Sequence, residues 1–295
     1  VLLRVQAAAL DRGTWHLMTG RPYLMRLMGF GFRKPKQPIP GLDVAGTVVE
    51  VGPAVTRFKV GDEVLGIAKG SYAQFAPALE SKLAKKPATL TFEQAAAIPV
   101  SGGTAIQAID AAGNFRPGAR VLVLGASGGV GTFAVQLAKA LGAEVTAAAS
   151  ASKLDFVRSL GADRPIDYAT GDHLTKPHRY DAILDIGGNT PLARLRRALA
   201  PEGRLVFVGG EHGGDLTGGF GRQLRALAVA PFTRQKFVPL MTKEDTQFIQ
   251  RVAAFVERGQ LTPAIDRVVP LNQLRAAMEV LVAGKVCGKI VLKVE

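Results

Sequence analysis

Hydrophobic and polar positions follow different patterns before and after about residue 100. Before it, short strand-like runs such as 45–51 and 63–66 are separated by glycine, proline and aspartate turn signals, which is typical of a β domain. From residue 120 onward, strand-like runs alternate with helical patterns, which predicts a parallel sheet wound by helices. The predicted strands cover 121–124, 145–149, 183–186 and 205–208, and the predicted helices cover 130–141, 152–160 and 194–199.

The first predicted helix has one apolar face suited to packing on a sheet. Val130, Ala134, Leu137 and Leu141 recur at helical spacing, and Gly142 ends the pattern. After about residue 230 the alternation stops, and a predicted helix at 246–258 precedes strands at 267–269 and 289–294. The chain is therefore expected to form an α/β fold with a second, β-rich domain.

Length and composition support two packed domains. The 295 residues are 47% hydrophobic and 21% charged, which is enough to bury a real core. No apolar run reaches about 18 residues and the start lacks a secretory signal, so a cytoplasmic protein is expected. The single cysteine, Cys287, excludes an intrachain disulfide and a multi-cysteine zinc lobe. Because the chain starts without methionine, on a predicted strand, an N-terminal segment is expected to precede it.

The chain is strongly basic, with a formal net charge of +13. Such a field attracts anions. We interpret it mainly as a solvated basic face, because few of the basic residues are clustered with aromatic side chains as single-strand binding requires. Nucleic-acid binding stays as a less favoured alternative. The acid-free stretch 12–42 includes Arg21, Arg26, Arg33, Lys34 and Lys36.

The strongest local motif is a glycine-rich turn between a buried strand and a helix, with the sequence VLVLGASGGVG at 121–131. Gly128 lets the backbone approach a pyrophosphate, and Gly131 lets the helix pack closely on the strand. The helix N-terminus presents N–H groups to the anion. Ala126 replaces a glycine of the usual motif. A turn without a ligand is the alternative, but the flanking strand and helix favour dinucleotide binding at Ala126, Gly128, Gly129 and Val130.

The end of the second predicted strand indicates which dinucleotide is bound. NAD-binding folds place an acid there for the ribose 2′-hydroxyl, whereas this chain has Ala149 followed by Ser150. Lys153 then supplies a cation suited to the 2′-phosphate of NADP. Taken alone, Lys153 would be an ordinary exposed lysine; together with the missing acid it predicts NADP(H).

Several longer motifs resemble one family. They are PGLDVAGTVVEVG at 40–52, FKVGDEVLG at 58–66, AAAIP at 95–99, GTA at 103–105, the glycine-rich turn, and 203–210. Together they cover essentially the whole chain and resemble the zinc-independent, quinone oxidoreductase-like branch of the medium-chain dehydrogenases/reductases.

The resemblance implies a GroES-like β-barrel domain from 1–99 and 231–295, beside an NADP-binding Rossmann domain at 100–230. It also implies an active site between the domains, a homodimer, and a family protein that begins roughly a strand pair earlier.

The same resemblance assigns further cofactor contacts. It implies Thr104 beside the nicotinamide and Val208, Gly209 and Gly210 along the nicotinamide ribose. Ser150, Lys153 and Tyr168 are expected to surround the 2′-phosphate and adenine, although Tyr168 alone would be interpreted as a surface tyrosine.

Zinc-dependent relatives carry three ligands at positions that correspond here to Asp11, Leu42 and Val100. Leucine and valine cannot ligate zinc. His173 and His178 are expected to be exposed loop histidines rather than ligands. No metal site is therefore expected.

Without a metal, hydride delivery to an electron-poor carbon is easier than oxidation of an alcohol, so quinones and α,β-unsaturated carbonyl compounds are the expected substrates. Candidate hydrogen-bond donors are His16 and Tyr23, with Trp15 lining the pocket and Asp11 at the vacated ligand position. Simple packing remains an alternative for each of them. The family's quinone reducers commonly show Asn and, three residues later, Asp, where this chain has Asp11 and Thr14.

The apolar and basic segment 213–239 is expected to form a loop and helix over the pocket, with a dimer contact or plain surface as alternatives. Two other functions stay open. One is a metal-free, NADP-dependent alcohol or aldehyde dehydrogenase. The other is an NADPH-regulated nucleic-acid-binding protein that uses the basic face.

Overall fold

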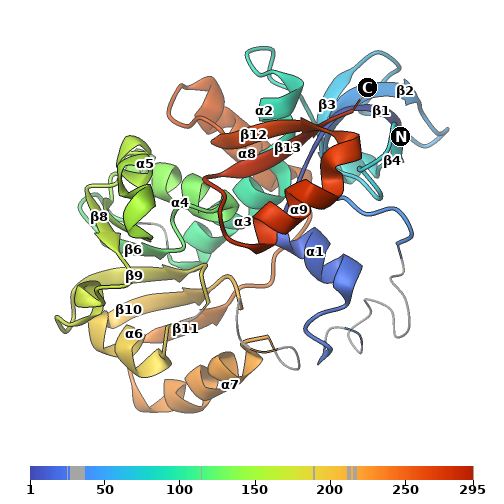
Figure 1. Cartoon of the computed structure of the whole chain (residues 1–295). Helices are drawn as coiled ribbons and strands as arrows, with labels where there is room; N and C mark the ends of the chain where they lie inside the picture. Colours follow the sequence, from blue (N-terminus) through green and yellow to red (C-terminus); the bar gives the residue numbers. More distant parts are fainter. Residues whose placement is uncertain are drawn as a thin grey trace. The chain divides into compact units, whose positions relative to one another are not determined.

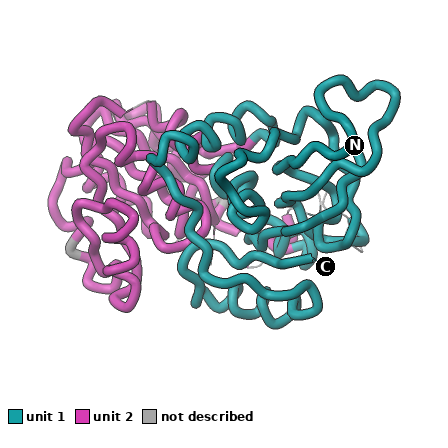
Figure 2. The backbone as a smooth tube through the Cα atoms, turned by 90° about the horizontal axis from the view of Figure 1, so that it is seen from above, with its two compact units in different colours: residues 1–20, 25–103, 243–295 teal, residues 21–24, 104–242 magenta. Residues whose placement is uncertain are grey.

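The computed structural model describes residues 1–24, 26, 37–113, 115–188, 190–210, 214 and 218–294. Its backbone divides into two compact units (Figure 2). The first comprises Val1–Gly20, Met25–Gly103 and Lys243–Glu295, and the second comprises Arg21–Leu24 and Thr104–Thr242. Of the expected basic stretch, Arg33, Lys34 and Lys36 lie outside the described residues. Among the residues that are described, no helix is long and apolar enough to cross a membrane.

The first unit is built on a seven-stranded sheet with the order β12-β13-β1-β2-β3-β5, in which β4 also pairs with β1. Neighbouring strands are antiparallel except for β12 and β13. Ala8 lies opposite both Val44 and Leu292, so the C-terminal tail returns to this sheet. The strands are β1 (Leu2–Ala9), β2 (Asp43–Glu50), β3 (Glu63–Ile67), β4 (Phe75–Pro77), β5 (Leu83–Lys85), β12 (Ile265–Pro270) and β13 (Lys289–Lys293).

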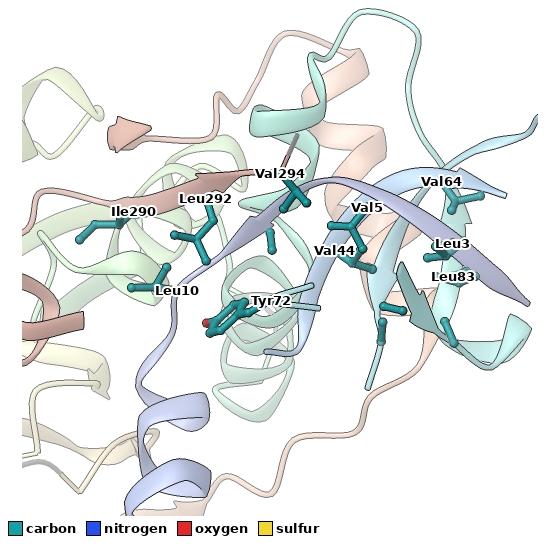
Figure 3. Packing of buried hydrophobic residues seen from close by; sticks show 14 of the residues in the cluster. Leu3, Val5, Leu10, Val44, Val64, Tyr72, Leu83, Ile290, Leu292 and Val294 are labelled. Atoms are coloured by element: carbon teal, nitrogen blue, oxygen red, sulfur yellow. The ribbon is translucent and has the colours of Figure 1, made fainter. Parts of the chain in front are cut away.

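The core of the first unit forms where apolar side chains from these strands meet (Figure 3). Leu3, Val44 and Leu292 are fully buried in it, and Met278 joins them from a helix. Burying a leucine or valine side chain stabilises the fold by about 1.5–3 kcal/mol. The helices of this unit are α1 (Arg12–Thr19), α2 (Phe92–Ala96), α8 (Thr246–Glu257) and α9 (Leu274–Val282), and α3 (Pro99–Ala111) is divided between the two units.

The second unit contains a six-stranded sheet in which every neighbouring pair is parallel, with the order β11-β10-β9-β6-β7-β8. This is the doubly wound order of dinucleotide-binding folds, with its reversal between β6 and β9. The strands are β6 (Arg120–Leu124), β7 (Glu144–Ala149), β8 (Arg164–Asp167), β9 (Tyr180–Asp185), β10 (Leu199–Phe207) and β11 (Lys236–Pro239).

Helices cover both faces of this parallel sheet, as the alternating pattern predicts. Figure 1 shows α4 (Gly129–Ala140) and α5 (Leu154–Ser159) on one face and α6 (Leu192–Ala198) and α7 (Phe220–Val229) on the other. Because both faces are buried, the central strands are almost continuously apolar. Leu195 and Ala226 complete the core under α6 and α7.

Two local elements differ from the prediction. The segment 213–239 ends in β11, which extends the sheet beyond residue 230, and the second unit runs to Thr242. An edge strand needs only one partner, so a short run containing lysine and ending in proline can form it. The helix expected at 152–160 begins as a 3₁₀ turn, η3 (Ala151–Lys153), and continues as α5.

Candidate cofactor and substrate sites

The glycine-rich turn connects the carboxyl end of β6 with α4. Ala126 is fully buried, and its N–H donates to the Ala148 carbonyl at 3.1 Å, which fixes the turn against β7. The first bond inside α4 runs from the Thr132 N–H to the Gly128 carbonyl at 2.9 Å. The N–H groups of Gly129 and Val130 precede that bond, so they lie at the positive end of the helix.

Two glycines of this turn are required for different reasons. A Cβ atom on Gly131 would lie 2.2 Å from the carbonyl oxygen of Gly125, so the close contact between α4 and the turn excludes any side chain. A Cβ atom on Gly128 would come no closer than 3.6 Å to the protein, an ordinary contact. The protein therefore leaves open the space over Gly128 that a pyrophosphate needs, so these residues fit a dinucleotide.

The residues expected around the 2′-phosphate lie together at the ends of β7 and β8. The Tyr168 N–H donates to the Ala149 carbonyl at 3.1 Å, and the Lys153 N–H donates to the Ser150 carbonyl at 2.9 Å. Tyr168 is 59% exposed, whereas Ser150 and Lys153 are half-buried. All three therefore follow strand ends on the same edge of the sheet.

One acid at this edge, Asp167, is not among the residues that the sequence predicted for the site. Asp167 ends β8 opposite Ala149. Its Oδ1 atom accepts the Ala169 N–H at 2.9 Å, so the carboxylate closes the turn that follows β8.

The expected nicotinamide-ribose residues also lie at the carboxyl ends of the strands. The N–H groups of Val208 and Gly209 donate to the Asp185 carbonyl at 3.0 and 3.2 Å. This joins the ends of β9 and β10 beside the reversal of strand order, where ligands bind in such sheets. Thr104, expected near the nicotinamide, is half-buried on α3.

A buried ion pair that the sequence did not predict lies at this edge. The Asp185 carboxylate is fully buried, lies 2.8 Å from Nη2 of Arg222 on α7, and accepts the Gly188 N–H at 3.1 Å. Burial raises the pKa of Asp185, although Arg222 and the Gly188 N–H favour its charged form. Arg222 also donates to the Thr190 carbonyl at 2.8 Å, so it ties α7 to the end of β9. An aspartate at the end of an apolar strand was the available signal.

The candidate substrate residues are divided between the units. Asp11, Trp15 and His16 belong to the first unit and Tyr23 to the second. The two Asp11 oxygens accept the Thr14 N–H at 2.6 Å and the Thr14 hydroxyl at 2.9 Å, so Asp11 is the N-cap of α1. Trp15 packs against the core of the first unit and contacts the His16 ring edge-on, with ring centroids 5.0 Å apart. Tyr23 is 41% exposed.

A second buried ion pair lies beside the positions compared with zinc ligands. Lys289 on β13 and Asp43 on β2 are buried, with Nζ and Oδ2 2.8 Å apart, and the Val100 N–H donates to the other Asp43 oxygen at 2.7 Å. Burial raises the pKa of Asp43 to about 6, although Lys289 favours the carboxylate; the nearby Asp11 adds to the rise. Asp43 directly follows Leu42 in the chain and accepts a hydrogen bond from Val100. The network therefore joins the surroundings of two positions that were compared with zinc ligands.

In the part of the chain that the structure describes, no three His, Cys, Asp or Glu side chains group closely enough to hold a metal ion. The prediction that His173 is an exposed loop histidine is wrong, because its side chain is buried; the residue lies in a 3₁₀ turn, η4 (Asp172–Leu174). His178 is exposed.

Comparison with known proteins agrees with this architecture. The family model described as "Alcohol dehydrogenase GroES-like domain" matches residues 1–88, and the one described as "Zinc-binding dehydrogenase" matches residues 160–292. The solved structure of the quinone oxidoreductase from Coxiella burnetii superposes with a TM-score of 0.85 and 28% identity, over 100% of this chain and 90% of that one.

Curated relatives carry related names. The chain is 35% identical to the chloroplast envelope quinone oxidoreductase homolog of Arabidopsis thaliana, over 99% of this chain and 89% of the relative. It is 32% identical to the 2-methylene-furan-3-one reductase of Solanum lycopersicum, over 99% of this chain and 71% of the relative. It is 33% identical to the mitochondrial NAD(P)H oxidoreductase RTN4IP1 of Mus musculus, over 86% of this chain and 70% of the relative. These names include chloroplast and mitochondrial proteins, so relatedness does not indicate a cytoplasmic location.

A GroES-like domain and a Rossmann-type sheet with a dinucleotide turn together define a nicotinamide-dependent oxidoreductase that acts on a small molecule. The chain belongs to the medium-chain dehydrogenase/reductase superfamily, in its quinone oxidoreductase-like branch.

Proposed function

We propose that this protein is an NADPH-dependent reductase that transfers hydride to quinones or α,β-unsaturated carbonyl compounds without zinc. The observation that carries the proposal is a dinucleotide turn in a chain with apolar residues, Leu42 and Val100, at two of three zinc-ligand positions. The roles of the domains are part of this proposal. The GroES-like domain, expected at 1–99 and 231–295, is assigned the catalytic residues, and the domain expected at 100–230, whose compact unit extends to Thr242, is assigned NADPH binding.

The cofactor contacts are assigned to the carboxyl edge of the second unit's sheet. Gly128, Gly129 and Val130 hold the pyrophosphate, Val208 to Gly210 hold the nicotinamide ribose, and Thr104 contacts the nicotinamide. The open space over Gly128 supports the first assignment. The bound nicotinamide supplies the hydride; the protein positions the cofactor and substrate and excludes water.

The preference for NADPH is supported by the end of β7. This strand ends at the buried Ala149 with no acid to accept a ribose 2′-hydroxyl, while Ser150, Lys153 and Tyr168 follow at the same edge. The nearest acid on the neighbouring strand, Asp167, ends β8 rather than β7, and its Oδ1 atom accepts the Ala169 N–H. A lysine ammonium beside a 2′-phosphate forms a charge-assisted hydrogen bond that NADH cannot form.

Changing Lys153 to alanine is expected to raise the KM for NADPH about tenfold or more, because a hydrogen bond to a charged group contributes roughly 1.5–3 kcal/mol. The kcat with NADPH and the KM for NADH should hardly change, because Lys153 is assigned far from the hydride and NADH lacks the phosphate. Steady-state kinetics with both cofactors measure this. Arg158→Ala, which removes one positive charge from neighbouring α5, is the matched control. Equal binding of NADH and NADPH by the unmodified protein would refute the assignment.

The substrate residues are assigned from both units. His16 and Tyr23 are the proposed hydrogen-bond donors to the substrate oxygen, on which negative charge develops during reduction. Trp15 lines the pocket. Asp11 stands at the vacated ligand position, and its two bonds to Thr14 support a positioning role, in which it holds the start of α1 and thereby His16.

A substrate panel tests the proposed reaction. Quinones and enones are expected to be reduced faster than simple alcohols are oxidised, and a chelator should leave the rates unchanged, because no metal stabilises an alkoxide. NADPH consumption followed by absorbance, together with elemental analysis for zinc, measures both. One tightly bound zinc per chain, or fast alcohol oxidation with inert quinones, would overturn the proposal.

A homodimer is also proposed, as the family resemblance implies. β11 is an edge strand of the six-stranded sheet. Edge strands are suited to contacts with a second chain.

A further inference from the structure

The second unit contains a cavity at the end of its sheet where the strands begin, opposite the end that carries the dinucleotide turn. It has a volume of about 470 Å³, and four of its eight lining residues are basic while none is acidic. The lining residues His178, Arg197 and Gln235 lie just before β9, β10 and β11 in the chain. The cavity therefore lies at the amino ends of these parallel strands. The lining side chains used below are His178, Arg196, Arg197, Thr233, Arg234 and Gln235.

Hydrogen bonds within the protein fix the walls of this cavity. The Gln235 amide donates to the carbonyls of Arg196 and Leu199 at 2.8 and 3.1 Å. The His178 N–H donates to the Arg197 carbonyl at 3.0 Å, and its Nδ1 atom lies 3.2 Å from the Leu199 carbonyl. Gln235 thus engages carbonyl oxygens at the end of α6 that would otherwise repel an anion.

Arg196 and Arg234 are only weakly neutralised by the described residues of the protein. Arg234 is 83% exposed, and its ion pair with the exposed Glu202 is long, at 3.8 Å, so it contributes little. The Nε atom of Arg196 is buried, and among the described residues it has no hydrogen-bond partner. Both arginines therefore keep positive charge that an anion in the cavity can offset.

Arginines at the end of a helix have an ordinary explanation, because they interact favourably with its dipole. That explanation covers Arg196 and Arg197 at the end of α6. It does not cover Arg234, which comes from the loop before β11 and lines the same cavity. Arginines contributed by two elements to one cavity are suited to binding phosphate oxygens.

We propose that this cavity is a second anion site, which binds a doubly or more highly charged phosphate group independently of the dinucleotide. The two sites lie at opposite ends of the same strands, and β9 alone, with six residues, is about 20 Å long. The phosphate belongs to a soluble phosphorylated compound or to a lipid headgroup. The exposed Phe232, next to Thr233, would contact the membrane in the second case.

Titration calorimetry with inorganic pyrophosphate at constant ionic strength tests the proposal on the full chain saturated with NADPH. Saturable binding is expected, with an affinity at least tenfold lower in Arg196→Gln/Arg234→Gln. The control Lys176→Gln/Arg225→Gln, which removes two exposed positive charges elsewhere in the same unit, should bind like the unmodified protein.

A Gly128→Ala variant separates the two sites, whether or not the protein prefers NADPH. Binding of pyrophosphate that survives Gly128→Ala but not the arginine substitutions supports the second site. Absence of saturable binding, or equal binding by the arginine variant and the unmodified protein, overturns it. Circular dichroism confirms that each variant is folded.

Sedimentation with phosphatidic acid vesicles identifies the source of the phosphate. Co-sedimentation that Arg196→Gln/Arg234→Gln abolishes and Phe232→Ser weakens supports the site and indicates a lipid headgroup. Pyrophosphate binding without co-sedimentation supports the site and indicates a soluble compound. Co-sedimentation that the arginine substitutions leave unchanged, with no pyrophosphate binding, contradicts it.

Discussion

Gly128→Ala is expected to weaken NADPH binding about a hundredfold, roughly 2.7 kcal/mol, without lowering the thermal unfolding midpoint. The added methyl group meets nothing in the protein closer than 3.6 Å, and the backbone at Gly128, with φ of −84°, is accessible to alanine. The same methyl group would occupy the space in which the backbone approaches a pyrophosphate. The substitution therefore acts on the ligand and not on the fold.

Gly131→Ala, three residues later, is the matched comparison. Here the added Cβ atom would lie 2.2 Å from the Gly125 carbonyl oxygen and 2.7 Å from backbone atoms of Ala126, so α4 must move away from the turn. Overpacking of this kind costs typically about 1–3 kcal/mol, and we expect both a lower unfolding midpoint and weaker NADPH binding. Calorimetric titration and thermal unfolding of the two variants measure this. If Gly128→Ala binds NADPH normally, the pyrophosphate lies elsewhere.

The sequence predicted the dinucleotide turn well because glycine reports directly on backbone geometry. Gly131 is required by a local contact between the turn and the helix that follows it. The residues that make this contact lie within a few positions of Gly131, so the sequence motif contains them all. The same holds for the parallel sheet, whose buried central strands are almost continuously apolar. β11 was missed because it is a short edge strand, and its pairing with β10 is a long-range property.

The buried ion pairs were missed because their partners are distant in sequence. Asp43 and Lys289 are separated by 246 positions, and Asp185 pairs with Arg222 from a helix that follows another strand. In each case an ionisable residue at the end of an apolar strand was the only local sign. For Asp11 the residue was predicted but its surroundings were not, since its engagement by Thr14 depends on where α1 begins.

Lys289→Met is expected to lower the free energy of unfolding of the first unit by about 3–5 kcal/mol, because it leaves the Asp43 carboxylate buried without its cation. The double variant Asp43→Asn/Lys289→Met should lose less than this single variant, since the amide removes the buried charge and keeps an acceptor for the Val100 N–H. Lys293→Met, at an exposed position of the same strand, is the control and should stay within about 0.5 kcal/mol of the unmodified protein.

The pH dependence of stability provides an independent check on the same pair. Burial raises the pKa of Asp43 to about 6, above the value of about 3.9 in an unfolded chain. The folded protein therefore holds this proton more tightly, so the contribution of Asp43 to stability is largest below about pH 4 and decreases as the pH rises through 6. Relative to Asp43→Asn, the unmodified protein should lose stability between pH 4 and 7. Urea unfolding followed by the fluorescence of Trp15, the single tryptophan, which packs against the first unit's core, measures both effects. Two results together would contradict a role of the Asp43–Lys289 pair in stability. The difference in unfolding free energy between the unmodified protein and Asp43→Asn would not change with pH, and Lys289→Met would be as stable as Lys293→Met.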